Sequence, residues 1–290
     1  MKVVESLHEV KAWRRELSRE ASLGLVPTMG ALHEGHLSLA RAARRECDAV
    51  AMSIFVNPTQ FGAGEDLDSY PRDREGDTRE ARGAGVDLLW FGFREELYPP
   101  GFATQVSVPA LGRSLCGRSR PHHFGGVALI VLKLFHIFRP RRAYFGLKDY
   151  QQFVLLRRMV IDLDLDLDLE VVPGAIVREA SGLALSSRNL RLSDAGRAAA
   201  AVLRRGLLAG RDSYEEGERH GARLVIAATR PILAEPRVSL EYLDLVDPWT
   251  LKAVAEVAPG RGAVLAVAAR VEGVRLIDNI ALGAAAEGPA

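Results

Sequence analysis

One stretch, residues 23–43, constrains the fold of this 290-residue chain more than any other. It begins with an apolar run typical of a buried strand, which Pro27 and Gly30 end. Apolar residues in its second half recur at helical spacing and indicate a helix with one buried side. Because residues 49–55 are a second apolar run of strand length, the sequence predicts a βαβ unit and an α/β fold with a parallel sheet.

Two histidines, His33 and His36, lie where this helix is expected to begin. They are three residues apart, so they are neighbours on the helix surface. The free N–H groups and positive dipole of a helix start favour an anion such as phosphate, and Gly35 allows a ligand to approach the backbone. A solvated helix start with incidental histidines is the alternative. Zinc is a weaker one, because the metalloprotease pattern is His-Glu-x-x-His.

Polar residues follow other expected strand ends, where ligands of parallel sheets bind. Asn57 and Gln60 come just after one such strand, and residues 146–152 repeat the order of strand, glycine and helix start with Lys148 among them. Residues 185–189 add two hydroxyls and a guanidinium that can hold a phosphate. Turn formation at Asn57, an exposed loop position for Gln60 and helix capping by nearby serines are the alternatives.

Residues 26–36, Val-Pro-Thr-Met-Gly-Ala-Leu-His-Glu-Gly-His, resemble the signature of the pantothenate synthetase (pantoate–β-alanine ligase) family. Further blocks that resemble the family follow in the family's order. They are residues 53–62, 65–72, 144–152 and 185–189, with a weaker one at 276–280. The resemblance implies ATP-dependent condensation of (R)-pantoate with β-alanine through a pantoyl adenylate, with release of pyrophosphate and AMP, in pantothenate and coenzyme A biosynthesis. It also implies a Rossmann-like nucleotidylyltransferase domain with a smaller α+β domain.

The resemblance assigns roles to individual residues of this chain. His36 would be the proton donor. The other residues expected to act in catalysis are His33, Lys148, Ser186, Ser187 and Arg188. ATP would contact Met29, Gly30, His33, His36, Gly146, Lys148, Asp149, Val177, Leu185, Ser186, Ser187 and Arg188. Pantoate and β-alanine would contact Gln60, Gln152, Asn57, Tyr70 and Arg120. Mg²⁺ is expected to enter with ATP, and no metal site formed by the protein alone is expected. The resemblance also implies a homodimer.

Three positions depart from the family's pattern. Leu147 stands where the family usually has Glu, and Ser181 where it usually has Asp. Both changes alter the charge expected near the ATP loops. Leu185 replaces a common Met, a swap that nearly conserves volume.

Composition excludes several classes of protein. Lys and Arg number 38 against 37 Asp and Glu, so no net field attracts nucleic acid or an anionic membrane. Apolar runs are too short for a membrane span, and the first residues lack the apolar stretch of a signal peptide, so we expect a cytoplasmic protein. Cys47 and Cys116 have neither a CxxC spacing nor a secretory context, which favours buried or incidental thiols over a disulfide or a nucleophile.

The remaining pattern predicts the order of the other elements. Helices are expected at residues 5–20 and 124–138, and strands at 85–91, 104–108, 143–145 and 171–177. The charged run at 65–83 is interpreted mostly as a solvated helical face, and 112–126 as a long loop of functional length. Aspartates alternating with leucines at 162–168 are interpreted as a helix tail entering a strand with one wet face.

The last third of the chain is expected to form a separate unit. Residues 195–234 have a helical period interrupted near Gly217, and 238–246 with 263–280 predict three antiparallel strands with a turn at Glu272. With a hinge near Gly182, we expect a Rossmann-like domain at 1–177 that binds ATP and pantoate, and a smaller α+β domain at 178–290.

Two other functions are compatible with parts of the sequence. A nucleotidylyltransferase that joins AMP to a phosphomonoester also uses His-x-x-His at a helix start. A non-catalytic nucleotide sensor, or an RNA-binding relative of class I aminoacyl-tRNA synthetases, belongs to another class, and near-zero charge without an RNA module argues against it.

Overall fold

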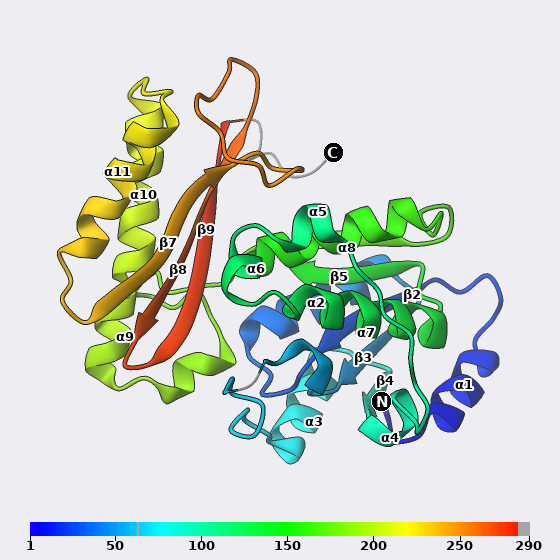
Figure 1. Ribbon diagram of the computed structural model, residues 1–290. Coiled ribbons are helices and arrows are strands. Elements are labelled where there is room, and N and C mark those ends of the chain that lie inside the picture. The colour runs from blue at the N-terminus through cyan, green and yellow to red at the C-terminus, as the bar shows by residue number, and fades with distance from the viewer. Residues whose placement is uncertain (63, 284–290) are drawn as a thin grey trace.

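The computed structural model describes residues 1–62 and 64–283, which fold into two lobes, each built on its own sheet (Figure 1). Within these residues the first sheet has the order β1-β4-β3-β2-β5-β6, and every strand pair in it is parallel. Its strands are β1 (Lys2–Val4), β2 (Leu23–Thr28), β3 (Ala49–Ile54), β4 (Leu88–Phe91), β5 (Arg142–Gly146) and β6 (Glu170–Gly174). The predicted parallel α/β fold is confirmed.

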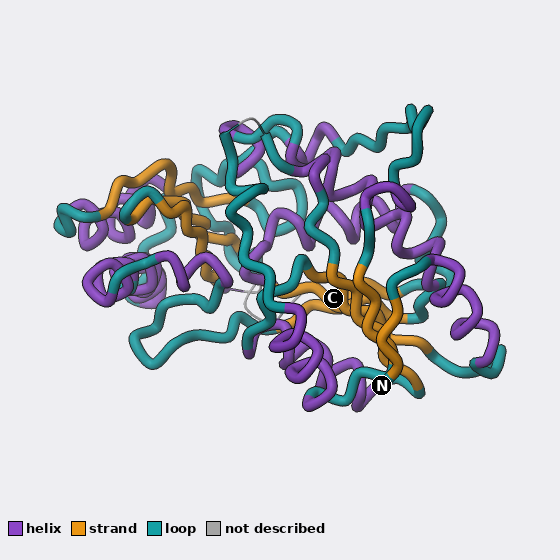
Figure 2. Tube along the Cα trace, turned by 90° about the horizontal axis from the view of Figure 1, so that it is seen from below, coloured by secondary structure: helices purple, strands orange, loops and turns teal. Residues whose placement is uncertain are grey.

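Helices cover both faces of this sheet (Figure 2). The longer ones are α1 (Leu7–Glu16), α2 (Glu34–Glu46), α3 (Arg74–Gly83), α7 (His123–Phe138) and α8 (Tyr150–Asp162). Short helical turns are α4 (Arg94–Leu97), α5 (Pro109–Gly112), α6 (Cys116–Ser119), η1 (Pro58–Gln60), η2 (Leu147–Asp149) and η3 (Ser187–Arg191).

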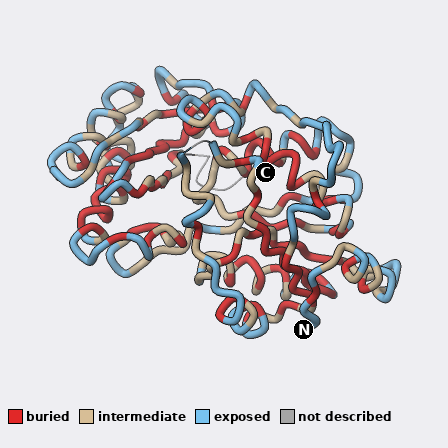
Figure 3. Tube along the Cα trace, turned by 60° about the horizontal axis from the view of Figure 1, so that its bottom comes forward, coloured by how far each residue is buried: buried red, intermediate tan, exposed pale blue. Residues whose placement is uncertain are grey.

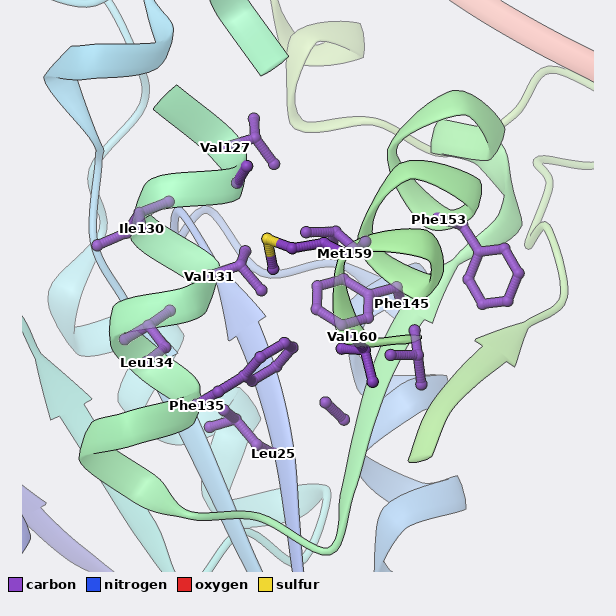
Figure 4. Packing of buried hydrophobic residues seen from close by; sticks show 14 of the residues in the cluster. Leu25, Val127, Ile130, Val131, Leu134, Phe135, Phe145, Phe153, Met159 and Val160 are labelled. Carbon is purple, nitrogen blue, oxygen red and sulfur yellow. The ribbon is translucent and has the colours of Figure 1, made fainter. Parts of the chain in front are cut away.

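Successive strand residues pack into different cores, since side chains of a strand alternate between faces. Leu25 packs with α1, α7 and α8, whereas Val26 packs with α2 and α3. The buried residues concentrate in these strands (Figure 3), and Figure 4 shows Val131 and Phe135 of α7 packed with Met159 of α8 and Phe145 of β5. Burial on both faces explains why these strands are continuous apolar runs.

The strand order reverses between β2 and β5. From β2 the chain builds outward through β3 and β4, while β5 and β6 extend the sheet in the opposite direction. In open α/β sheets such a switch point leaves a crevice at the carboxyl ends of the strands, where ligands bind. The residues that follow β2 and β5 therefore face one crevice.

The second lobe contains the predicted three-stranded antiparallel sheet, β7 (Val238–Val246), β8 (Ala263–Val271) and β9 (Val274–Leu282). Helices α9 (Asp194–Ala200), α10 (Val202–Glu215) and α11 (Gly221–Leu233) belong to it, and its buried residues form a core that is separate from those of the first sheet. Val264 and Ala266 of β8 instead join the first lobe's core, so one face of the small sheet packs against the first lobe. The boundary after residue 177 stays a prediction.

Several expected elements differ in the structure. Residues 104–108, all of which are described, form no strand, and the helix expected at 5–20 is shorter and preceded by β1. The aspartates at 162–168 do not enter a strand, because α8 ends at Asp162 and Asp164 turns the chain with φ of 53°. The expected strand at 171–177 ends at Gly174.

The stretch expected to be a hinge forms a small hairpin. Arg178 and Ala184 make an antiparallel bridge, and Gly182 adopts a φ of 88° at the turn. The exposed Ser181 lies beside it at the tip. Among helices of the described chain, none is long and apolar enough to cross a bilayer.

Candidate active site

A cavity of about 200 Å³ opens at the carboxyl ends of β2 and β5. Apolar side chains of α7, such as Val127 and Val131, form part of its wall. It is lined, from separate loops, by residues that the sequence predicted to form the site: Met29, His33, His36, Asn57, Gln60, Tyr70, Gly146, Lys148, Asp149, Gln152, Val177, Leu185, Ser186, Ser187 and Arg188. The fold thus gathers almost the whole expected site in one place.

The turn between β2 and α2 is held by a carboxylate that sequence reasoning missed. Gly30 and Ala31 have φ of 86° and 49°, so the chain is left-handed at two successive residues. Asp77 of α3, only 4% exposed, accepts hydrogen bonds from the N–H groups of Ala31 at 3.0 Å and Leu32 at 2.7 Å. Gly30 itself lies outside the cavity lining, and its N–H donates to the Thr28 hydroxyl at 3.2 Å.

His33 and His36 lie at the start of α2 with their rings stacked, 4.1 Å between centroids. The Gly35 N–H donates to Nδ1 of His33 at 3.1 Å, and the His33 N–H donates to Nδ1 of His36 at 3.4 Å. An imidazole whose Nδ1 accepts carries its proton on Nε2. Each ring is therefore fixed in the tautomer that offers an N–H to a ligand.

Burial keeps both rings neutral. It lowers the pKa of His33 to about 4, with the charge of Lys148 acting in the same direction. Burial, followed by the charges of His33 and Lys148, also lowers the pKa of His36 well below its ordinary value. At pH 7 the pair consequently donates hydrogen bonds without carrying charge.

Asn57 and Gln60 form a buried amide cluster beyond the end of β3. The Asn57 amide donates to Oε1 of Gln60 at 3.1 Å and to the Gly126 carbonyl at 3.1 Å, while the Tyr98 hydroxyl donates to its oxygen at 2.8 Å. Nε2 of Gln60 approaches Sδ of Met29 at 3.2 Å. Both hydrogens of the Asn57 amide are used, and one of them orients Gln60. The Gln60 amide keeps a hydrogen that it can donate to a ligand.

Arg188 enters the cavity from η3, held on two sides. Its guanidinium makes a two-point ion pair with Asp66 and lies 5.7 Å from the centre of the Tyr70 ring. The Tyr70 hydroxyl lies 3.0 Å from Oγ of Ser187. Although burial opposes ionisation, the hydrogen bonds and charge of Arg188 lower the pKa of Asp66. Two cationic groups, Arg188 and Lys148, thus line a site suited to a polyphosphate.

Arg120 lies in the adjoining cleft between the lobes, which has a volume of about 500 Å³. Its guanidinium pairs with Glu65 and donates to the Gln60 carbonyl at 3.3 Å, and Nδ1 of His123 lies 2.9 Å from the same oxygen. Arg120 therefore holds the backbone of Gln60 from the side of the interlobe cleft and does not line the smaller cavity.

These contacts correct the interpretation of residues 65–83 as mostly a solvated helical face. Within this run only residues 74–83 are helical. Three carboxylates of the run have structural partners: Glu65 pairs with Arg120, Asp66 with Arg188, and Asp77 with the turn after β2. The partners lie far away in sequence, so no local pattern indicated them. Similarly, the expected loop at 112–126 begins at the last residue of α5, contains the short helix α6 and ends in the first turn of α7. Cys116 in it is buried and contacts Tyr242 of the second lobe.

The fold and these side chains define an α/β enzyme whose site suits ATP. Residues 2–281 match the family described as pantoate-beta-alanine ligase. The chain is 50% identical to the pantothenate synthetase of Heliobacterium modesticaldum, over 97% of this chain and 99% of that one. It is 52% identical to the one of Moorella thermoacetica, over 91% and 92% of the two chains. The chain belongs to the pantoate–β-alanine ligase family, and its activity is the ATP-dependent condensation of pantoate with β-alanine.

Solved structures agree with this assignment. A crystal structure of pantothenate synthetase from Thermus thermophilus superposes with a TM-score of 0.90 at 47% identity, covering 97% of this chain and 99% of that one. The enzyme from Francisella tularensis, complexed with an ATP compound and β-alanine, gives a TM-score of 0.78 at 30% identity over 97% of both chains.

Proposed function

We propose that the condensation proceeds through an enzyme-bound pantoyl adenylate. In the first step a carboxylate oxygen of (R)-pantoate attacks the α-phosphorus of ATP, and the bond to the β-phosphate breaks to release pyrophosphate. In the second step the amine of β-alanine attacks the acyl carbon, AMP leaves with the acyl oxygen, and the amine loses a proton. The products are pantothenate, AMP and pyrophosphate.

The observation that carries this proposal is the convergence of phosphate-binding groups at the switch point. Neutral N–H donors of His33 and His36 line one cavity with Lys148 and Arg188. Donors fixed before the reaction stabilise the charge that develops on the phosphate in the transition state. His36 is the proton donor that the resemblance implies; as a neutral ring, we assign it an N–H hydrogen bond to that phosphate, and Ser186 and Ser187 add hydroxyls from η3 and its cap.

Recognition of the acid belongs to the amide side of the cavity. Gln60 and Gln152 line it together with Asn57 and Tyr70. A neutral amide can donate to a carboxylate and accept from a hydroxyl, which are the two groups that pantoate presents. Arg120 supports this side through the Gln60 carbonyl, and its position in the interlobe cleft suits the approach of β-alanine.

The side-chain pairing supports a route without a covalent acyl-enzyme. Ser187 is hydrogen-bonded to Tyr70, and Nδ1 of each histidine already accepts a backbone hydrogen bond. A serine nucleophile needs an adjacent free base. Cys116 lies at the interlobe contact, where its sulfur meets Tyr242 at 3.1 Å, outside the smaller cavity.

Mg²⁺ enters, in this proposal, as part of the ATP substrate. No cluster of three His, Cys, Asp or Glu side chains among the described residues is arranged to hold a metal. Mg²⁺ commonly takes one or two carboxylates, phosphate oxygens and water. Asp149 in the cavity, together with ATP, fits that donor set.

We also propose a cytoplasmic homodimer. The resemblance of the sequence blocks to a usually dimeric family supports the dimer. The two free thiols support a reducing compartment.

Omission of β-alanine tests the proposed route. ATP and pantoate alone should give about one pyrophosphate per site, and hydroxylamine added afterwards should trap pantoyl hydroxamate. Pyrophosphate that forms only with β-alanine present, or formation of ADP and phosphate, would contradict it. Exchange of pyrophosphate into ATP that needs tRNA or a phosphomonoester in place of pantoate would favour the alternative functions.

A further inference from the structure

The Asp-Asn pair at 278–279 has no role so far, although the block that contains it resembles the family. Both residues lie on β9 and are buried, at 4% and 6% exposure. β9 pairs with β8 without interruption from Val274 to Leu282, and Asn279 is registered with Ala266. The sheet therefore fixes the position of both side chains.

Strand alternation sends the two side chains in opposite directions. Ile277 and Ala281 pack with the first lobe's core, whereas Leu276 and Leu282 pack with the helices of the second lobe. Successive residues of a strand face opposite sides, so Asn279 faces the first lobe, as Ile277 and Ala281 do, and Asp278 faces the helices of the second lobe. One dipeptide thereby reaches partners on both faces of the sheet.

Asn279 holds the loop that carries Lys148. Its Nδ2 donates to the carbonyls of Leu147 at 2.8 Å and Lys148 at 3.1 Å. A primary amide has two donor hydrogens, so both are used. The turn η2 is thus attached to the second lobe at the two peptide carbonyls that flank the Cα of Lys148, whose side chain enters the cavity.

Asp278 holds the hairpin that precedes Ser186. Its carboxylate oxygens accept from Arg178 at 2.7 and 2.9 Å, and Arg178 also donates to the Gly182 carbonyl at 3.1 Å. The base of this hairpin is closed by the Leu185 N–H, which donates to the Val177 carbonyl at 2.9 Å. Both residues at that base line the cavity.

The two attachments are also joined to each other, since the Asn279 N–H donates to Oδ1 of Asp278 at 2.8 Å. We propose that Asp278 and Asn279 are positioning residues for the ATP-activating step, which set the separation between the Lys148 loop and the loop of Ser186 and Arg188. Neither needs to touch the substrate. The inference rests on the proposed roles of Lys148 and Arg188 toward ATP.

Substitution of Asn279 is the direct test. Asn279→Ala leaves two carbonyls without their donor, and the isosteric Asn279→Asp places a carboxylate against them, so both should weaken binding of ATP alone by about tenfold or more. KM for β-alanine, measured in the second step on preformed adenylate, should remain near the wild-type value. ATP binding is measured without pantoate, so its outcome is independent of whether an adenylate forms.

A double-mutant cycle separates positioning from general stability. If Asn279 acts through Lys148, Asn279→Ala should cost little further ATP affinity in a Lys148→Ala background. Val271→Ala is the matched control, because Val271 is a buried residue of the same sheet whose alkyl side chain packs in the second lobe's core and can make no hydrogen bond to either loop. Wild-type ATP affinity in both Asn279 variants would overturn the proposal. So would an equal loss in the Lys148→Ala background, or an equal loss in Val271→Ala.

The Asp278 arm is tested through its partner. Arg178→Lys keeps the charge but loses the two-point geometry, and should lower ATP affinity in the same direction as Asp278→Asn. If both variants fold and bind ATP as wild type does, the hairpin does not need this attachment and this half of the proposal is wrong.

Discussion

The carboxylate of Asp66 accepts two hydrogen bonds from Arg188, from Nε at 2.7 Å and from Nη2 at 3.0 Å, across 122 positions of sequence. This pair ties the loop after η1 to the first turn of η3. Because guanidinium has five N–H donors, Arg188 keeps donors for a phosphate while Asp66 fixes its plane. The ion pair therefore prepares the arginine for its ligand.

Asp66→Ala should lower kcat/KM for ATP by about tenfold, since removal of one partner frees a cation that was held in place. Arg188→Ala should lower it further, and Asp66→Ala should add little in that background. Asp68→Ala, an exposed neighbour, is the control and should stay near wild type. Additive losses in the double variant would show that Asp66 acts independently of Arg188. The measurement is steady-state kinetics with ATP varied.

His36→Ala should lower kcat by about 10²–10³-fold, because a fixed N–H donor toward developing phosphate charge is lost. The midpoint of thermal unfolding should change far less than it does for a core truncation. The control is His136→Ala, since His136 is exposed at the far end of α7. A folded His36→Ala protein with wild-type turnover would remove His36 from the mechanism.

Asp77→Ala should reduce both stability and ATP affinity. It deprives the N–H groups of Ala31 and Leu32 of their acceptor, at a cost of about 1–3 kcal/mol each if they stay buried. Asp73→Ala on the same helix removes only its N-cap, and should cost about 1 kcal/mol of stability without changing KM for ATP. Equal effects of the two variants on KM would mean that Asp77 matters only as part of α3.

Gln151 and Gln152 are adjacent, but truncation of one should affect stability and truncation of the other should affect substrate binding. Gln152 lines the cavity, so Gln152→Ala should raise KM for pantoate by about tenfold. Gln151 is buried and donates to the carbonyls of Leu111 and Ser114 at 2.8 and 2.7 Å, so Gln151→Ala should chiefly lower the unfolding temperature. The reverse pattern in kinetics and calorimetry would exchange their roles.

Acid should destabilise the fold partly through His123, whose pKa burial lowers to about 4, assisted by the charge of Arg120. The unfolded chain takes up that proton near pH 6.5, so the folded state binds fewer protons between about pH 6.5 and 4. Stability should therefore fall as pH decreases through this window. His123→Gln should flatten the slope, measured by urea unfolding at several pH values, whereas His136→Gln should not. An unchanged slope in His123→Gln would contradict the assignment.

Local sequence determined the elements around the site. The apolar run before Pro27 and the helical spacing after His33 predicted β2 and α2, because periodicity and strand-ending residues act over a few neighbours. The three strands of the second lobe were predictable for the same reason. Resemblance then identified which of the polar loop residues belong to the site, and the fold places nearly all of them around one cavity.

Tertiary structure alone decided which side chains hold those residues. Asp77 lies in a charged run that has no local mark of burial, and the choice between Gln151 and Gln152 depends on which face of α8 meets α5. The same is true of Asn279, whose carbonyl partners lie 131 and 132 positions away. The physical reason is that local periodicity sets which face of an element is apolar, whereas the strand order and the packing of one lobe on the other set what each polar group meets.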